Sequence, residues 1–420
     1  MIPGDPAYDA GVSDNPPDDP NNPFGQSNPF GGVPIFSDLA KMFQNQGPLS
    51  WDAAQQFALG IATNGQPEAN VDPVARIQIE QLARVAELQV ANATGLDPSP
   101  AGQGLTIVPV TRSVWARETL EAYRPLFEIL AESLKDDGAG PDAFGGEPDP
   151  GDPMGFMAPL MKMIGPMMLG LTAGSMVGHL ATRSFGPYGL PIPRPPSDRL
   201  SIVVANLDEF GEEWSLPADD LRLWVCLHEV AHHAVLGVPH VRARFDALLH
   251  EYLAGFESDP GRLENELSGF DSMDLTGPDA FQQMLGNPEV VLGAIQSPAQ
   301  LHLLPQLEAL VCVVVGYVDV VMDEIGEGLL SNYGMITEAV RRRRVEAAQS
   351  DRFVEQLFGL ELTQAAYDRG SAFVKGVLER GGKPALQRLW RSERELPTPA
   401  EVDAPGLWLA RIDLPDDPIT

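Results

Sequence analysis

The segment Val225–Ala234 constrains this chain more than any other, because it places ionisable groups within an otherwise apolar run. It contains the pattern His-Glu-x-x-His at His228, Glu229 and His232. At 3.6 residues per turn, the two histidines lie one turn apart on the same face of a helix. The apolar surroundings predict a buried helix, and a buried polar group needs a partner.

The ends of this helix are also visible in the sequence. Pro217 and the acidic residues Asp219 and Asp220 are typical of a helix start. Gly237 and Pro239 are typical of a helix end. We therefore expect one helix between Pro217 and Gly237.

Two imidazoles at this spacing are typical of a zinc site that takes one further protein ligand and keeps one position for water. Zinc lowers the pKa of such a water, and Glu229 lies where it can take the proton and pass it to a leaving amine. The pattern predicts a zinc-dependent hydrolase, most simply a peptidase. The alternative is a surface helix with incidental histidines.

Two carboxylates are candidates for the third ligand. Glu251 follows His232 after eighteen intervening residues, in a predicted helix over Arg242–Phe256. This spacing is similar to that of the gluzincin aminopeptidases, in which a glutamate on the next helix completes the metal site. Asp319 lies in the very apolar stretch Leu303–Met322, where an ionisable group is costly unless it pairs or binds something. Glu251 could instead be an exposed carboxylate, and Asp319 a satisfied buried one.

Several segments resemble the zincin-like metallopeptidase type 2 family of actinobacteria and their relatives. They are the motif itself together with Leu200–Asn206, Gly316–Asp319, Leu357–Tyr367 and Gly370–Phe373. The resemblance spans roughly residues 45 to 390, with the metal motif as its only specific anchor. It implies a zinc-dependent hydrolase, and one branch of the family is associated with deazaflavin-coenzyme biosynthesis.

The chain departs from the family at one position. Members carry a Glu-Gly pair in the long apolar helix, where this sequence has Val315-Gly316. The departure leaves open a catalytically inactive zincin-like scaffold or interaction protein. Retention of Glu229 favours an enzyme, because a structural site has no use for a general base. The family association also allows a non-peptidase amidohydrolase that serves cofactor assembly.

Three further side chains could stabilise negative charge that develops on a substrate oxygen. They are Tyr252, Tyr317 and His233, since a phenol or imidazole near the metal can donate a hydrogen bond. Each of them could equally be a packing residue.

The charge balance is strongly acidic, with 28 basic and 59 acidic residues and a formal net charge of −31. Such a field repels phosphate backbones and argues against nucleic-acid binding. The basic cluster Arg341–Arg344 is expected to form a solvated helix face that pairs with local acids. The cysteines, Cys226 and Cys312, both lie in apolar runs, and no signal peptide is recognisable at the start of the sequence. These features predict a cytoplasmic protein without a disulfide framework.

The expected fold class is mainly α, a zincin-like helical domain with a small amount of β near the metal helix. Leu200–Val204 is the clearest strand candidate. Met154–His179 is expected to be a buried helix rather than a stable membrane insertion, because Lys162 and Pro166 interrupt it. The predicted organisation is a disordered tail at 1–33, a helical region at 34–135, an acidic Gly/Pro linker at 136–152, the metal-binding domain at 153–395 and a C-terminal tail at 396–420.

Overall fold

The computed structural model describes residues 49–99, 102, 104–134, 153–258, 294–346 and 349–414. The chain divides into Met1–Gly47 and a compact unit, Pro48–Thr420, to which all described residues belong. The disordered tail predicted at 1–33 and the linker predicted at 136–152 lie outside the described residues.

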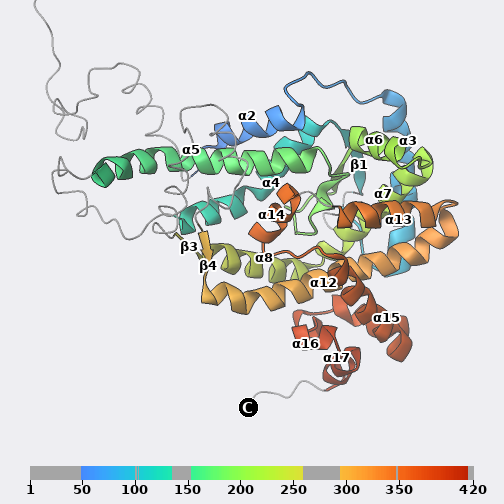
Figure 1. Ribbon diagram of the computed structural model, residues 1–420. Coiled ribbons are helices and arrows are strands. Elements are labelled where there is room, and N and C mark those ends of the chain that lie inside the picture. Colours follow the sequence, from blue (N-terminus) through green and yellow to red (C-terminus); the bar gives the residue numbers. More distant parts are fainter. Residues whose placement is uncertain are drawn as a thin grey trace, which may run out of the picture. The chain divides into compact units, whose positions relative to one another are not determined.

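The described part of the chain is mainly helical, which confirms the predicted fold class (Figure 1). The helices that concern the site and its supports are α2 (Trp51–Ala62), α3 (Pro73–Thr94), α4 (Arg112–Ser133), α5 (Pro153–Ala181), α6 (Val204–Glu213), α7 (Ala218–Leu236), α8 (Pro239–Ala254), α12 (Pro298–Leu329), α13 (Tyr333–Val345), α14 (Gln349–Leu357), α15 (Gln364–Leu386), α16 (Pro399–Val402) and α17 (Pro405–Ile412). Short 3-10 turns are η2 (Pro187–Gly189), η4 (Gln387–Trp390) and η5 (Glu393–Glu395).

The described strands form two small sheets. β1 (Thr106–Val110) pairs in parallel with β2 (Arg199–Val203), and β3 (Phe256–Ser258) pairs antiparallel with β4 (Ala294–Gln296). The strand predicted at Leu200–Val204 is β2, displaced by one residue. Its partner β1 was not predicted, and Pro109 within it is tolerated because a strand in a two-stranded sheet is an edge strand.

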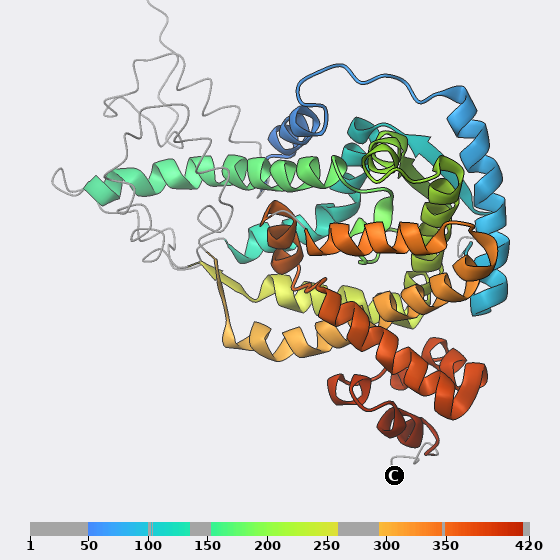
Figure 2. The ribbon, with the colours of Figure 1, turned by 45° about the vertical axis from the view of Figure 1, so that its right-hand side comes forward.

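Local signals set the helix ends where they are strong. α3 begins where the Asp72 carboxylate accepts a hydrogen bond from the Val74 N–H, and it ends at Gly95 in the left-handed conformation. The motif helix α7 begins after Pro217 and ends at Gly237, as predicted. It packs against α3 and α12, and most of its second half is buried. α12, the lighter of the two orange helices in Figure 2, also packs against α15.

α5 packs closely along α2 (Figure 1), and its glycines Gly170, Gly174 and Gly178, four positions apart, lie against α2. A Cβ on Gly178 would lie 2.8 Å from the Cβ of Ile61, so the backbones approach more closely than larger residues allow. Among the described residues, the one helix long and apolar enough to cross a membrane is α12, and 67% of its most apolar window is buried within the protein. The core helix of a globular protein meets the same length and composition test.

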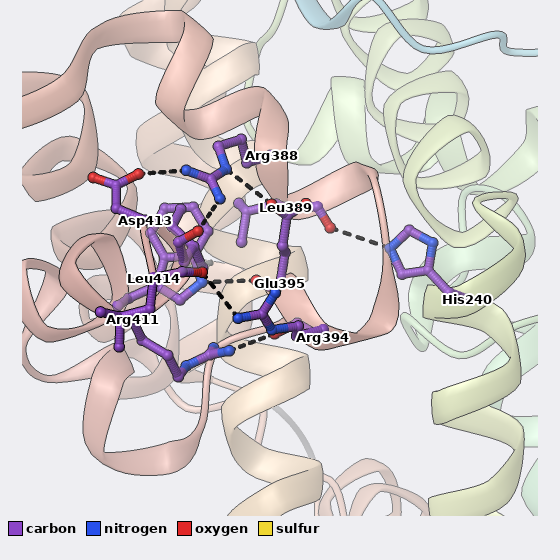
Figure 3. Close-up of polar contacts among 10 residues, drawn as sticks. His240, Arg388, Leu389, Arg394, Glu395, Arg411, Asp413 and Leu414 are labelled. Atoms are coloured by element: carbon purple, nitrogen blue, oxygen red, sulfur yellow. Dashed lines mark hydrogen bonds and ion pairs between the residues drawn. The ribbon is translucent and has the colours of Figure 1, made fainter. Parts of the chain in front are cut away.

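The C-terminal region corrects the predicted tail at 396–420, because α16 and α17 lie within it. Trp408 is fully buried, its ring meets Phe373 edge-on at 5.5 Å, and its indole N–H donates to the Glu395 carbonyl at 2.7 Å. Figure 3 shows Arg388 joining Glu395 to Asp413, at 2.8 and 2.6 Å. These elements are short, so their stability comes from long-range contacts that leave little periodicity in the sequence.

The basic cluster on α13 also differs from the prediction. Arg341 and Arg342 are exposed and pair with Glu338, as expected for a solvated face. Arg343 and Arg344 instead turn toward the protein, where they lie over aromatic rings. Four consecutive residues sweep about 300° around a helix, so one solvated face cannot hold them all.

Candidate metal and catalytic site

The histidine pair of α7 lies as the sequence predicts. The ring centroids of His228 and His232 are 4.4 Å apart on consecutive turns. Trp224, one turn earlier, stacks on His228 at 4.9 Å with an interplanar angle of 16°. The His228 side chain is 14% exposed and His232 is buried, so three aromatic rings line one face of α7.

Both imidazoles are held in the neutral form. Burial is the main cause that lowers the pKa of His228 to about 3, and Arg344 lowers it further. Burial likewise lowers the pKa of His232 to about 3, with a further contribution from His228. A neutral imidazole is the form that can bind a metal ion.

The neighbouring oxygens select which ring nitrogen is free. His232 Nδ1 lies 3.0 Å from the His228 carbonyl oxygen, which can only accept, so Nδ1 carries the proton. His228 Nδ1 lies 3.3 Å from Glu229 Oε1, a longer contact that favours the same tautomer. Both Nε2 atoms are then left with a free lone pair, as in metal-binding histidines whose other nitrogen is tied by a second partner.

The carboxylate of Glu229 is buried beside the two rings. Its Oε2 accepts a hydrogen bond from the backbone N–H of Tyr188 at 2.9 Å, and the side chain is 3% exposed. Burial raises the pKa of Glu229, and the Tyr188 hydrogen bond opposes that rise. A carboxyl group with a raised pKa suits a residue that must accept a proton and then release it.

Tyr188 on η2 is the residue that sequence reasoning missed. Its ring stacks on His232 at 6.0 Å with an interplanar angle of 16°, and its hydroxyl lies 2.8 Å from His233 Nδ1. A Cβ on Gly186 would lie 2.6 Å from Glu229 Oε2, so the segment before η2 presses directly on the carboxylate. In the sequence, Tyr188 is visible as an aromatic residue between two glycines in a proline-rich connector. Its partners Glu229 and His233 lie more than forty residues away, so the sequence does not show that Tyr188 belongs to the site.

His233, a candidate oxyanion donor, is engaged by Tyr188. Burial is the main cause that lowers the pKa of His233 to about 4, and burial raises the pKa of Tyr188. The phenol therefore stays protonated and donates a hydrogen bond to His233 Nδ1.

Asp319 on α12 lies close enough to the motif to act on it electrostatically. Its carboxylate raises the pKa of His228, whereas Arg344 lowers it. The Asp319 carboxylate and the Arg344 guanidinium form a bidentate ion pair. Arg344 Nη2 lies 3.3 Å from Asp319 Oδ1, and Arg344 Nη1 lies 3.4 Å from Asp319 Oδ2. The Arg344 guanidinium also lies 3.8 Å from the ring centroid of Tyr367.

Glu251, the other candidate ligand, is exposed, and among the described residues it forms no group of three possible ligands with the histidines. It lies in the last turn of α8, about 18 Å along that helix from its first residue at 1.5 Å per residue. Its side chain is exposed and lines a surface pocket of about 550 Å³ together with His250 and His302. A zinc ligand must place an oxygen about 2 Å from the metal, and the buried His232 is not at this surface.

The remaining candidates serve packing in the structure. The Tyr252 hydroxyl donates to the Gln356 carbonyl at 3.3 Å, and Tyr317 meets Trp390 edge-on at 4.8 Å. Val315, where the resemblance implied a glutamate, is fully buried. Cys226 is a buried free thiol, and burial raises its pKa to about 12.

Two candidate ligands, His228 and His232, therefore lie side by side, and no third candidate among the described residues is assembled with them. Within the described ranges, no group of three or more His, Cys, Asp or Glu residues is arranged to hold a metal ion. The donor chemistry nevertheless fits zinc, since two neutral imidazoles offer free Nε2 atoms and a carboxylate lies nearby. Asp319 would have to leave Arg344 to complete the set.

The fold and the site together define a mainly helical protein built around a buried His-Glu-x-x-His helix. The zincin-like metallopeptidase family matches residues 49–409, and the chain belongs to this family. The match identifies the family and not a branch of it.

The structure is also similar to a solved one, the crystal structure of a proposed hydrolase with a novel fold from Chloroflexus aurantiacus. The TM-score is 0.61 at 23% sequence identity, over 87% of this chain and 99% of that one. At this identity the likeness shows a shared fold alone. A comparison with the curated proteins gives no match.

Proposed function

We propose that this protein is a zinc-dependent hydrolase that cleaves peptide bonds. The observation that carries the proposal is the pair of neutral imidazoles with free Nε2 atoms beside a buried carboxylate fixed by the Tyr188 N–H. Membership of the zincin-like metallopeptidase family supports it.

In this proposal His228 and His232 would hold the metal, and Asp319 would be the third ligand if it left its ion pair with Arg344. Bound zinc supplies Lewis acidity that makes water a nucleophile at neutral pH. Glu229 would receive the proton on its carboxylate, whose Oε2 accepts from the Tyr188 N–H and whose Oε1 lies 3.3 Å from His228 Nδ1. It would then deliver the proton to the leaving amine.

A second candidate is a zincin-like scaffold without turnover. It is favoured by Val315 in place of the family glutamate and by the absence of an assembled three-ligand group among the described residues. An oriented Glu229 argues against it, since holding a buried carboxylate in place costs free energy that a scaffold need not spend.

The proposal also covers the cellular location and the class of substrate. Two buried free thiols, Cys226 and Cys312, suit a reducing cytoplasm. The net charge of −31 argues against nucleic acid as a partner and leaves peptides or proteins as the substrate class.

Metal content and peptide hydrolysis of the purified full chain test the proposal. We expect one zinc per chain, retained in Glu229→Gln, with hydrolysis of a peptide library reduced about 100- to 10,000-fold. Glu251→Ala is the matched control, because its exposed carboxylate is outside the site, and it should keep both properties. A wild type that binds no zinc overturns the enzyme proposal, and full zinc without hydrolysis supports the scaffold.

A further inference from the structure

A polar pocket lies beside the C-terminal end of α5, and none of the histidine-site residues lines it. Its volume is about 220 Å³, which is room for roughly seven water molecules or one small amino acid. The lining comes from the turn after α5, from α6 with Trp214 that follows it, and from the C-terminal end of α13. Three segments that are distant in sequence therefore enclose one small space.

Arg343 supplies the positive wall of this pocket. Its guanidinium lies 4.1 Å from the ring centroid of Phe185 and 5.0 Å from that of Phe210, and it donates to the backbone carbonyl of Arg183. Burial is the main cause that lowers the pKa of Arg343 to about 10, and Arg183 lowers it further, so the group is still charged at neutral pH. In the described part of the chain no carboxylate forms an ion pair with it. Because a charge withdrawn from water is costly without an opposite charge, this guanidinium favours an anionic partner.

Glu213 and Glu346 supply the negative wall. Both side chains are exposed and both line the pocket. Glu213 acts to raise the pKa of Arg343, yet within the described ranges neither carboxylate forms an ion pair. A third carboxylate in the lining, that of Glu209, already lies 2.5 Å from the guanidinium of Arg112. Opposite charges therefore attract each other across the pocket without touching.

Asn206 fixes the frame of the pocket. Its buried side-chain nitrogen donates to the carbonyl oxygens of Ala181 and Ser184 at 2.9 and 2.7 Å, and its Oδ1 accepts from Arg112 Nε at 2.6 Å. These hydrogen bonds tie α6 to the end of α5, and the hydrogen bond from Arg343 ties α13 to the same turn. The walls are thus held in place before a ligand arrives, which lowers the entropy cost of binding.

We propose that this pocket binds a small zwitterion of the amino-acid class, with its carboxylate on Arg343 and its ammonium at Glu213 and Glu346. The planar guanidinium matches a carboxylate in shape and charge. A simple anion would meet the two glutamates, and a simple cation would meet Arg343, so a molecule that carries both charges fits best. Phe210 and Trp214 also line the pocket and suit an apolar side chain, which makes leucine an appropriate probe. The inference does not depend on a metal at the histidine pair.

The experiment is a calorimetric titration of the full chain with glycine and with L-leucine. A metal chelator is present throughout, so that neither amino acid binds through a metal ion. Isocaproate is leucine without its ammonium group, and isoamylamine is leucine without its carboxylate. We expect leucine to bind and each of these two analogues to bind about tenfold or more weakly, because each loses one charged contact.

Arg343→Gln and Glu213→Gln test the two walls separately. Each should weaken leucine binding about ten- to a hundredfold. Arg342→Gln and Glu212→Gln are the matched controls, since Arg342 pairs with Glu338 on the exposed side of α13 and Glu212 is an exposed residue of α6 outside the pocket. Both controls should bind leucine as the wild type does. Arg343→Lys keeps the charge without the planar fork, so it should also bind more weakly and serves if the glutamine variant does not fold.

A wild type that binds neither glycine nor leucine would overturn the proposal. Isocaproate or inorganic phosphate that binds as tightly as leucine would also overturn it, because the pocket would then be a simple anion site. Unchanged leucine affinity in both Arg343→Gln and Glu213→Gln would show that leucine binds elsewhere. Failure of the proposed zinc hydrolase is a separate result, since it is read from metal content and peptide hydrolysis.

Discussion

Gly186 tests whether the position of Glu229 controls activity. A Cβ at this residue would lie 2.5 Å from Glu229 Cδ and 2.6 Å from Oε2. Ordinary contacts between such atoms are about 3.5–4.0 Å, so the carboxylate or the chain must shift by about 1 Å. The backbone at Gly186 is extended, with φ −152°, so alanine meets no torsional strain there and the perturbation is purely one of space.

The expected result of Gly186→Ala is a displaced base in a folded protein. A misplacement of about 1 Å costs on the order of 100-fold in rate. Loss of the hydrogen bond from the Tyr188 N–H to the buried carboxylate should cost about 1–3 kcal/mol of unfolding free energy. Zinc content should stay at the wild-type level, because neither His228 nor His232 is touched.

The assays are kcat for the best peptide found with the wild type, zinc stoichiometry, and hydrogen exchange of the Tyr188 amide. Exchange needs no substrate, and we expect it to accelerate as the hydrogen bond to Glu229 weakens. Gly328→Ala is the matched control, because a Cβ there has no atom within 4 Å. Wild-type kcat and unchanged amide exchange in Gly186→Ala would refute the assigned role of this segment.

Three further predictions concern stability, each read from denaturant unfolding. Tyr188→Phe removes the hydroxyl from His233 Nδ1 but keeps the backbone N–H on Glu229, so it should cost about 1–2 kcal/mol at unchanged zinc content. Trp408→Ala should cost about 3–5 kcal/mol because Trp408 is fully buried against Phe373, and a smaller loss would show that the C-terminal helices are dispensable. Burial raises the pKa of Glu355 from 4.5 to about 7, so the unfolded chain loses this proton first and wild-type stability should fall by about 2 kcal/mol as pH rises from 4.5 to 7. Glu355→Gln should remove that part of the pH profile, and an unchanged profile would contradict the assignment.

The sequence alone determined the features that depend on neighbours along the chain. Local hydrogen bonds and turn residues fix the ends of α7 and the caps of α3. The helical period places His228 and His232 on one face. The small residues repeated every four positions on α5 also indicate close packing against another helix, although only the structure shows that this helix is α2. These are short-range effects, and they survive in almost any tertiary setting.

Only the tertiary structure decided which groups surround the histidines. Tyr188 reaches Glu229 across forty-one positions of sequence, and Arg344 reaches Asp319 across twenty-five. Spacing made Glu251 as plausible a ligand as Asp319, but the paths of α8 and α12 leave Glu251 exposed and bring Asp319 into the field of His228. Such choices depend on how helices cross, which is set by packing over the whole core and is not encoded in any local stretch.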